Sequence, residues 1–167
     1  MKLPLVVTLL VAGIVAGNPA WSHGDSSGKK QASTPSAQAV EEQPFGRPGD
    51  PRKVTRTIRI EMLDSMHFLA GDLRVRQGET IRFVVVNKGK AMHEMVIGTM
   101  RDLKEHAELM RKHPGMEHDE PYMAHIAPGK TGTITWQFTK SGDFHYACLI
   151  PGHMEAGMVN RITVAAK

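Results

Sequence analysis

The sequence predicts an all-β domain, a Greek-key sandwich or barrel with one helical excursion between its strands. Short segments that alternate apolar and polar residues recur along most of the chain, and turns rich in Gly and Pro separate them. Many short strands with such turns are typical of sandwiches and barrels. One segment departs from this pattern because its apolar residues repeat at helical spacing. The sequence contains no internal repeats.

The first part of the predicted domain reads as a series of strands. Residues 54–60 alternate apolar and polar side chains, which indicates a half-buried strand. Residues 80–86 form an apolar, β-branched run suited to a central strand. Further strand candidates are 66–69, 73–76 and 92–97, and the turns between the strands are 70–72, 77–79 and 87–89.

The helical excursion covers residues 101–112. Leu103, Ala107 and Met110 repeat at helical spacing, which predicts a surface helix ended by Pro114-Gly115. A polar loop at 116–121 follows.

The last part of the chain returns to strands. Residues 131–138 alternate, with Ile134, Trp136 and Phe138 on one face. Residues 144–148 and 159–164 are the remaining candidates, and Gly-containing turns separate them from what precedes.

Residues 1–22 are expected to be a secretory signal peptide. Lys2 precedes an apolar run, and small residues follow it. Cleavage after Ser22 fits the small-residue rule, and cleavage after Ala20 is the alternative. The apolar run is shorter than the ~20 residues that a membrane span needs, so we expect removal, export to the periplasm and no membrane span in the mature chain.

Residues 23–50 are expected to form a disordered linker, and residues 51–167 the folded domain. The linker segment is rich in Ser, Gly, Gln, Ala and Pro and has no apolar period. Such a composition cannot bury enough apolar surface to fold.

Composition excludes some partners and points to an occupied thiol. The net charge of +4 is small and dispersed, and no basic run has interleaved aromatic residues, so a nucleic-acid partner is not expected. The chain has one cysteine, which cannot form an internal disulfide. A free thiol in an exported protein is a liability unless something such as a metal occupies it.

The strongest chemical signal is Cys148-x4-His153-x4-Met158. A thiolate, an imidazole and a thioether are three of the four ligands of a blue-copper site. Pro151-Gly152 predicts a tight turn that would bring His153 back toward Cys148.

A fourth ligand must come from a different strand. His93, just past the break at 87–89, is the best candidate, and His67 is the runner-up. In residues 144–148, alternation places Cys148 on the same face as two aromatic residues, Phe144 and Tyr146, which would keep the thiolate dry.

These motifs resemble the cupredoxin (type 1 copper) family. The resemblance is carried by Asn87-x-Gly89 followed by His93 and by Phe144-x-Tyr146-x-Cys148-x4-His153-x4-Met158, and it covers about residues 53–167. It implies a Greek-key β-sandwich that binds copper. By the resemblance, His93, Cys148 and His153 are equatorial ligands and Met158 is the weak axial ligand.

Within the family the chain is similar to periplasmic cupredoxins of bacterial copper tolerance. The segments that carry this similarity are 93–99, 115–121 and 151–158. One position departs from many electron-carrying members, which have Asn or Ser after the first histidine to brace the two ligand segments. This chain has Glu94 there.

The excursion also suggests a second copper site. His106 and Met110 share a helix face, and Met116 and His118 follow closely, with Met123 and His125 beyond them. The alternative is a solvated helix and loop with scattered polar residues.

The expected function is copper binding in copper tolerance, with redox cycling of exported copper as an extension of it. The alternative is a soluble shuttle that carries electrons between respiratory partners. Copper ions are the expected ligand, and a redox protein or a copper exporter is the expected protein partner. An enzyme is not expected beyond a weak Cu(I) oxidation, because the chain has one cysteine and no His-x-His pair.

Overall fold

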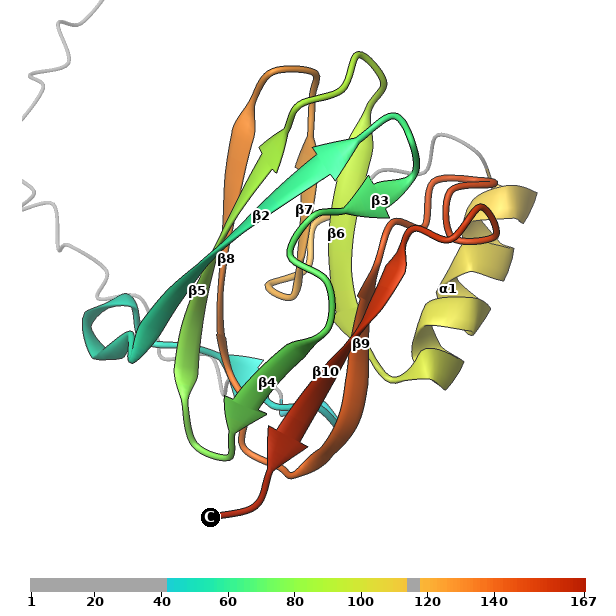
Figure 1. The fold of residues 1–167 in the computed structure, drawn as a ribbon. Helices are drawn as coiled ribbons and strands as arrows, with labels where there is room; N and C mark the ends of the chain where they lie inside the picture. The colour runs from blue at the N-terminus through green and yellow to red at the C-terminus, as the bar shows by residue number, and fades with distance from the viewer. Residues whose placement is uncertain (1–41, 114–117) are drawn as a thin grey trace, which may run out of the picture. The chain divides into compact units, whose positions relative to one another are not determined.

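The computed structural model describes residues 42–113 and 118–167. The predicted signal peptide and residues 23–41 of the predicted linker lie outside these described residues. The described residues form two five-stranded sheets and one α-helix (Figure 1). This confirms the all-β sandwich with a helical excursion.

The first sheet has the strand order β1-β8-β5-β2-β3. Its strands are β1 (Arg47–Pro48), β8 (Thr131–Gln137), β5 (Thr80–Asn87), β2 (Arg56–Leu63) and β3 (His67–Phe68). The pair β2–β5 is parallel, and the other pairs are antiparallel. Strand β5 lies at the centre of this sheet, as its apolar β-branched run predicts.

The second sheet has the order β4-β10-β9-β6-β7. Its strands are β4 (Leu73–Arg76), β10 (Val159–Ala165), β9 (Gly142–Ala147), β6 (His93–Gly98) and β7 (Met123–Ile126). Only the pair β4–β10 is parallel. Strands β6 and β9, which carry or precede the predicted ligands, are therefore neighbours.

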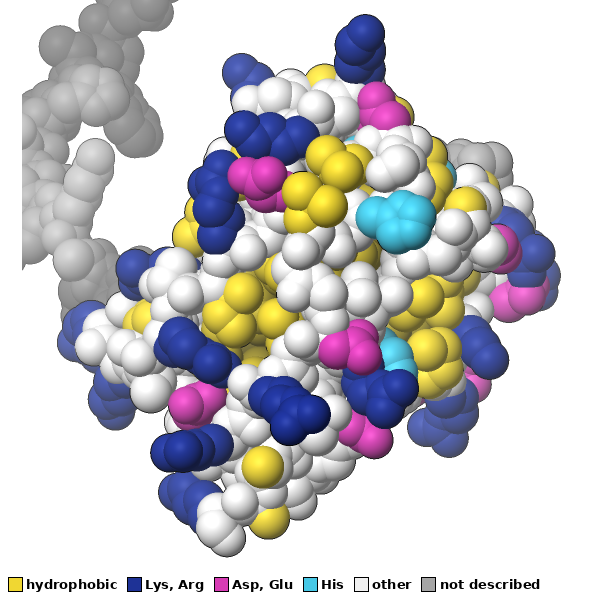
Figure 2. Space-filling model, viewed as in Figure 1, with side chains coloured by type: hydrophobic (Ala, Val, Ile, Leu, Met, Phe, Trp, Pro, Cys, Tyr) yellow, Lys and Arg dark blue, Asp and Glu magenta, His cyan; other side chains and the backbone are white. Residues whose placement is uncertain are grey.

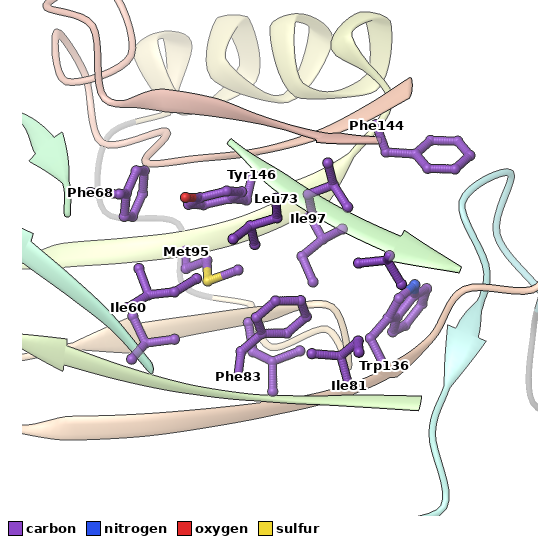
Figure 3. Packing of buried hydrophobic residues seen from close by; sticks show 14 of the residues in the cluster. Ile60, Phe68, Leu73, Ile81, Phe83, Met95, Ile97, Trp136, Phe144 and Tyr146 are labelled. Atoms are coloured by element: carbon purple, nitrogen blue, oxygen red, sulfur yellow. The ribbon is translucent and has the colours of Figure 1, made fainter. Parts of the chain in front are cut away.

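The core lies between the two sheets (Figure 3). Phe83 and Trp136 project from the first sheet, and Met95, Ile97 and Tyr146 from the second, all with no exposed side-chain surface. Alternate residues of each strand point inward because the side-chain period of a strand is two. Both sheets therefore contribute side chains to one shared apolar core.

Helix α1 (Met100–Lys112) covers the outer face of the second sheet. Its N-cap is Thr99, whose Oγ1 accepts the Asp102 N–H at 3.2 Å. Leu103 and Ala107 pack with Val96 of β6 in a small second core. The predicted helix is confirmed, and its apolar stripe faces the sheet.

The N-terminal boundary predicted at residue 51 is wrong. Phe45 is 2% exposed and stacks on Trp136, with ring centroids 5.2 Å apart, and its carbonyl accepts the Trp136 Nε1–H. Strand β1 pairs with the end of β8, and a 3-10 helix (Pro51–Lys53) connects it to β2. Residues 42–50, assigned to the linker by composition, belong to the domain.

A glycine permits this N-terminal packing. Gly46 has φ of +131°, a conformation that favours glycine. A Cβ there would lie 2.1 Å from the Gln137 carbonyl oxygen. The close approach of the segment to β8 therefore excludes any larger residue at this position.

The surface carries both signs of charge. Figure 2 shows Lys and Arg side chains around the periphery of one face, with Asp and Glu among them rather than in one basic stripe. In the part of the chain that the structure describes, no helix is both long and apolar enough to cross a membrane.

Candidate metal centre

Three of the predicted ligands converge at one end of the sandwich. The ligand atoms of His93, Cys148 and His153 all lie within 4.8 Å of one another. The Cys148 Sγ is 3.2 Å from the His153 Nδ1, and the two imidazole centroids are 5.0 Å apart. Among the described residues, this is the one group of three or more His, Cys, Asp or Glu that meets this spacing.

Strand pairing explains how His93 and Cys148 meet. His93 begins β6, and Cys148 follows the last residue of β9, which pairs antiparallel with β6. Because the two strands are antiparallel, the start of β6 lies beside the end of β9. Neighbouring strands lie about 4.8 Å apart, so the side chains of His93 and Cys148 lie at the same end of the sheet.

The loop after Cys148 brings the other two ligands back. The His153 N–H donates to the Ile150 carbonyl at 2.9 Å, which closes the turn predicted at Pro151-Gly152. The Cys148 N–H donates to the Met158 carbonyl at 3.1 Å, so Met158 returns beside the cysteine. Met158 is fully buried in the same core cluster as Cys148.

The His93 imidazole is oriented by a carboxylate. Its Nε2 lies 3.1 Å from the Asp64 Oδ1. Its Nδ1 is buried and has no hydrogen-bond partner among the described residues. An imidazole that donates one N–H to a carboxylate can bind a metal through its other nitrogen. In His93, the nitrogen left for copper is the unpartnered Nδ1.

Asp64 itself is fixed by the backbone. It accepts the N–H groups of Lys90 and Ala91 at 2.7 and 3.2 Å. These bonds, the Lys90 bond first, hold the pKa of Asp64 below its usual value. Asp64 is a positioning residue that the sequence analysis missed, because a carboxylate in a turn 29 residues before His93 carries no local signal.

Burial changes the chemistry of the thiol. Desolvation raises the pKa of Cys148 to about 12. The thiol is therefore protonated at neutral pH in the copper-free protein, and metal binding must displace its proton. Burial also lowers the pKa of His153, which keeps that imidazole neutral and able to bind a metal.

Glu94 connects the two ligand segments. Its backbone N–H donates to the Cys148 Sγ at 3.4 Å, and its Oε1 accepts the Leu149 N–H at 2.7 Å. The residue is 1% exposed. The Glu94 carboxylate thus links the two ligand segments by a hydrogen bond. Asn or Ser was expected to make this link in many electron-carrying cupredoxins.

The donor set fits copper. A thiolate, two imidazoles and a thioether combine the soft ligands that favour Cu(I) with nitrogen ligands that serve both oxidation states. His93, Cys148 and Met158 have no exposed surface, whereas His153 is partly exposed. Copper would therefore be held in a dry site whose one solvent-facing ligand is His153.

The other sequence-predicted site residues lie elsewhere. His67, the runner-up ligand, is exposed, and its Nδ1 lies 2.6 Å from the Ser65 carbonyl. His106 and His118 do meet, with ring centroids 4.8 Å apart. Met110 instead lies on the buried side of α1, and Met116 is outside the described residues. The structure thus brings together only the two histidines of the predicted second site.

Comparison with protein-family models shows which family the chain belongs to. The model described as "Copper binding proteins, plastocyanin/azurin family" matches residues 54–165. The chain belongs to this family. The match covers both sheets from β2 to β10 and all four residues of the candidate centre.

Curated relatives share most of the chain's length. The chain is 46% identical over 156 residues to the "Copper-resistant cuproprotein CopI" of Rubrivivax gelatinosus, covering 93% of each chain. It is 32% identical to the protein of the same name from Pseudomonas aeruginosa, covering 96% of each. A third, from Vibrio cholerae, is 35% identical over 118 residues, 70% of each chain.

Solved structures share the fold. An auracyanin of Roseiflexus castenholzii superposes with a TM-score of 0.57 at 22% identity, covering 67% of this chain and 98% of the other. Auracyanin B gives a TM-score of 0.59 at 19% identity, covering 75% and 98%. At this identity the likeness concerns the cupredoxin fold alone.

Proposed function

We propose that this protein binds copper in the periplasm and acts in copper tolerance. The observation that carries the proposal is the convergence of His93, Cys148 and His153 within 4.8 Å, beside a buried Met158. The names of the curated relatives, copper-resistant cuproproteins, support the physiological role. The signal-like residues 1–22 support the location.

The site residues divide the work of binding. Cys148 supplies the thiolate once its proton is displaced, and Asp64 holds the His93 imidazole in place. His153, partly exposed, is the ligand through which copper would enter and leave. Bound copper supplies one-electron chemistry between Cu(I) and Cu(II).

Redox cycling is the second part of the proposal. A dry site with both soft and nitrogen ligands accommodates both oxidation states. Oxidising Cu(I) requires a partner to take the electron, and a redox protein is the expected acceptor, with a copper exporter as the source of the metal. Beyond weak Cu(I) oxidation, we expect no enzymatic turnover.

Growth on graded copper tests the role. A strain that lacks the gene is expected to be copper-sensitive, and the wild-type gene should restore growth while Cys148→Ala should not. Asp72→Ala provides a control, because Asp72 is not a predicted ligand. Its carboxylate accepts the Arg161 N–H in β10, and its removal should leave rescue intact.

Respiration in the same strains separates tolerance from electron transfer. Respiratory electron flow at low copper should stay close to that of the parent strain. If respiration fails in the deletion strain while copper resistance is normal, the protein is an electron shuttle and the proposal is wrong.

A further inference from the structure

The outer edge of the second sheet carries two exposed arginines. Strand β4 is the outermost strand of this sheet, and its residues alternate between buried and exposed. Leu73 and Val75 are buried, so Arg74 and Arg76 point outward from the same side of the strand. Two residues along a strand span about 7 Å, which brings the two guanidinium groups within reach of one small ligand.

A third arginine reaches this edge from the first sheet. Arg56 begins β2, and its Nη2 donates to the Arg74 carbonyl at 2.7 Å and lies 3.4 Å from the Glu79 Oε2. The same carboxylate oxygen accepts the Arg76 N–H at 3.1 Å. Arg56 and Glu79 therefore connect the two sheets at this point and occupy two backbone groups on the open side of β4.

A recess lies between these side chains. Its volume is about 310 Å³, and its lining consists of Arg56, Arg74, Val75, Arg76, Glu79 and Ala165. Ligand pockets in proteins begin at about 300 Å³. Figure 2 shows several Lys and Arg side chains over this lower part of the sandwich, around β4 and the end of β10. The recess is therefore large enough for a small ligand and lies in a basic part of the surface.

The positive charge of the recess is only partly balanced. Three cationic side chains and one carboxylate line it, which gives a net charge of +2. The carboxylate of Glu79 already interacts with Arg56 and with the Arg76 backbone. Within residues 42–113 and 118–167, the side chains of Arg74 and Arg76 make no ion pair or hydrogen bond. Both guanidinium groups therefore present unused N–H donors at the recess.

Protection of the sheet edge does not explain this arrangement. Charged side chains on an edge strand hinder its pairing with another chain, and any charged side chain serves that purpose. Here Arg56 and Glu79 already occupy backbone groups of β4. Side chains of like charge that lie close together are destabilising. Two unpaired guanidinium groups beside a recess fit an anion that neutralises both.

We propose that this recess binds a phosphate-bearing ligand through Arg74 and Arg76, with Arg56 at its floor. A guanidinium group presents a planar fork of N–H donors that matches the oxygen atoms of phosphate. A phosphate monoester carries nearly two negative charges at neutral pH and has three acceptor oxygens. It therefore accepts hydrogen bonds from two forks at once and balances the net charge of the recess, whereas a single carboxylate balances half of it.

The recess lies at the end of the sandwich away from the copper ligands. Strand β10 begins at Val159, next to Met158, and ends at Ala165, which pairs with Arg76. The seven residues of β10 span about 20 Å. A protein held by a ligand in the recess therefore keeps His153, the partly exposed copper ligand, at the opposite end. The site does not depend on copper binding or on the role in copper tolerance.

Phosphate binding by the chain that begins at His23 tests the site. Arg74→Gln/Arg76→Gln should bind inorganic phosphate about tenfold more weakly than the wild type or worse in calorimetry, because hydrogen bonds between charged groups contribute at least about this factor. Arg74→Lys/Arg76→Lys keeps the charge without the planar fork and should have an intermediate affinity.

A matched variant separates the site from general electrostatic attraction. Arg101→Gln/Lys104→Gln removes the same charge from exposed positions of α1 and should bind inorganic phosphate as the wild type does. All the variants should unfold at the urea concentration of the wild type, which shows that the domain is folded. Equal loss of affinity in this variant and in Arg74→Gln/Arg76→Gln would overturn the proposal.

Vesicles identify the source of the phosphate. Sedimentation with phosphatidylglycerol vesicles but not with phosphatidylcholine vesicles, lost in Arg74→Gln/Arg76→Gln, would identify a lipid headgroup. Binding of inorganic phosphate without sedimentation would identify a soluble phosphate compound. If the wild type binds neither inorganic phosphate nor phosphatidylglycerol vesicles, or if Arg74→Gln/Arg76→Gln binds them equally well, the proposal is wrong and these arginines only protect the sheet edge.

Discussion

Asp64 connects the turn before β6 to His93, the first predicted copper ligand. It accepts two backbone N–H groups and lies 3.1 Å from the His93 Nε2. Removing such an outer carboxylate typically weakens metal binding 10- to 100-fold. Asp64→Ala should therefore weaken copper binding by about this factor, measured by competition with a copper chelator of known affinity.

Matched variants separate this role from a general effect on the fold. Asp64→Asn keeps an acceptor for His93 and should lose less affinity than Asp64→Ala. Asp72→Ala, which removes another backbone-bonded carboxylate, should keep wild-type affinity. Equal copper affinities for Asp64→Ala and the wild type would show that the contact does not position His93.

The buried thiol makes the copper-free protein sensitive to alkaline pH. Desolvation raises the pKa of Cys148 from 9.0 to about 12 in the folded state. A group with a raised pKa stabilises the folded state fully below its unfolded pKa, and this contribution is lost as pH rises toward the folded pKa. The free energy of unfolding of the copper-free protein should therefore fall between about pH 9 and 12.

Urea unfolding at pH 8 and pH 10.5 measures this loss. Burial also raises the pKa of Tyr146, so part of the loss belongs to the tyrosine and should persist in every variant that retains it. Cys148→Ala should show a smaller loss than the wild type, because only the thiol contribution is gone. Identical losses in the two proteins would contradict the assignment to Cys148.

Among the elements, the N-terminal segment has the clearest energetic role. Phe45 is buried against Trp136 and Tyr122, and β1 covers the end of β8. Replacing a buried Phe by Ala typically costs about 3–5 kcal/mol. Phe45→Ala should lower the free energy of unfolding by about this amount in chemical denaturation, and Phe45→Leu should cost less.

Two truncated chains locate the boundary of the domain. A chain that begins at Glu42 should unfold at the same denaturant concentration as the chain that begins at His23. A chain that begins at Pro51 lacks Phe45 and β1 and should unfold at a clearly lower concentration. Equal midpoints for the two truncated chains would show that residues 42–50 do not stabilise the domain.

Local patterns predicted some elements well and others not at all. The alternation at 131–138 and the β-branched run at 80–86 predicted β8 and β5 to within one residue. Strand β7 has its buried residues at Met123 and Ile126, three apart, so no period of two was visible. Strand β1 is two residues long and lies in a segment whose composition resembles a linker.

At the scale of the whole molecule, the sequence predicted those site residues that lie close together along the chain. Cys148, His153 and Met158 lie within eleven residues, so their spacing alone indicated a metal site. Asp64 reaches its partner through tertiary packing, and His125 reaches Glu94 through sheet pairing. Neither relation has a signature in the sequence, because each depends on which segments the fold brings together.

Copper binding through the Cys148 thiolate is the central feature of the proposed function. The most direct test is the visible absorption spectrum of the purified protein with one equivalent of Cu(II), recorded beside that of Cys148→Ala. The wild type should show a strong thiolate-to-copper charge-transfer band, and Cys148→Ala should show none. A band that survives in Cys148→Ala, or is absent from the copper-loaded wild type, would contradict a copper centre formed by His93, Cys148, His153 and Met158.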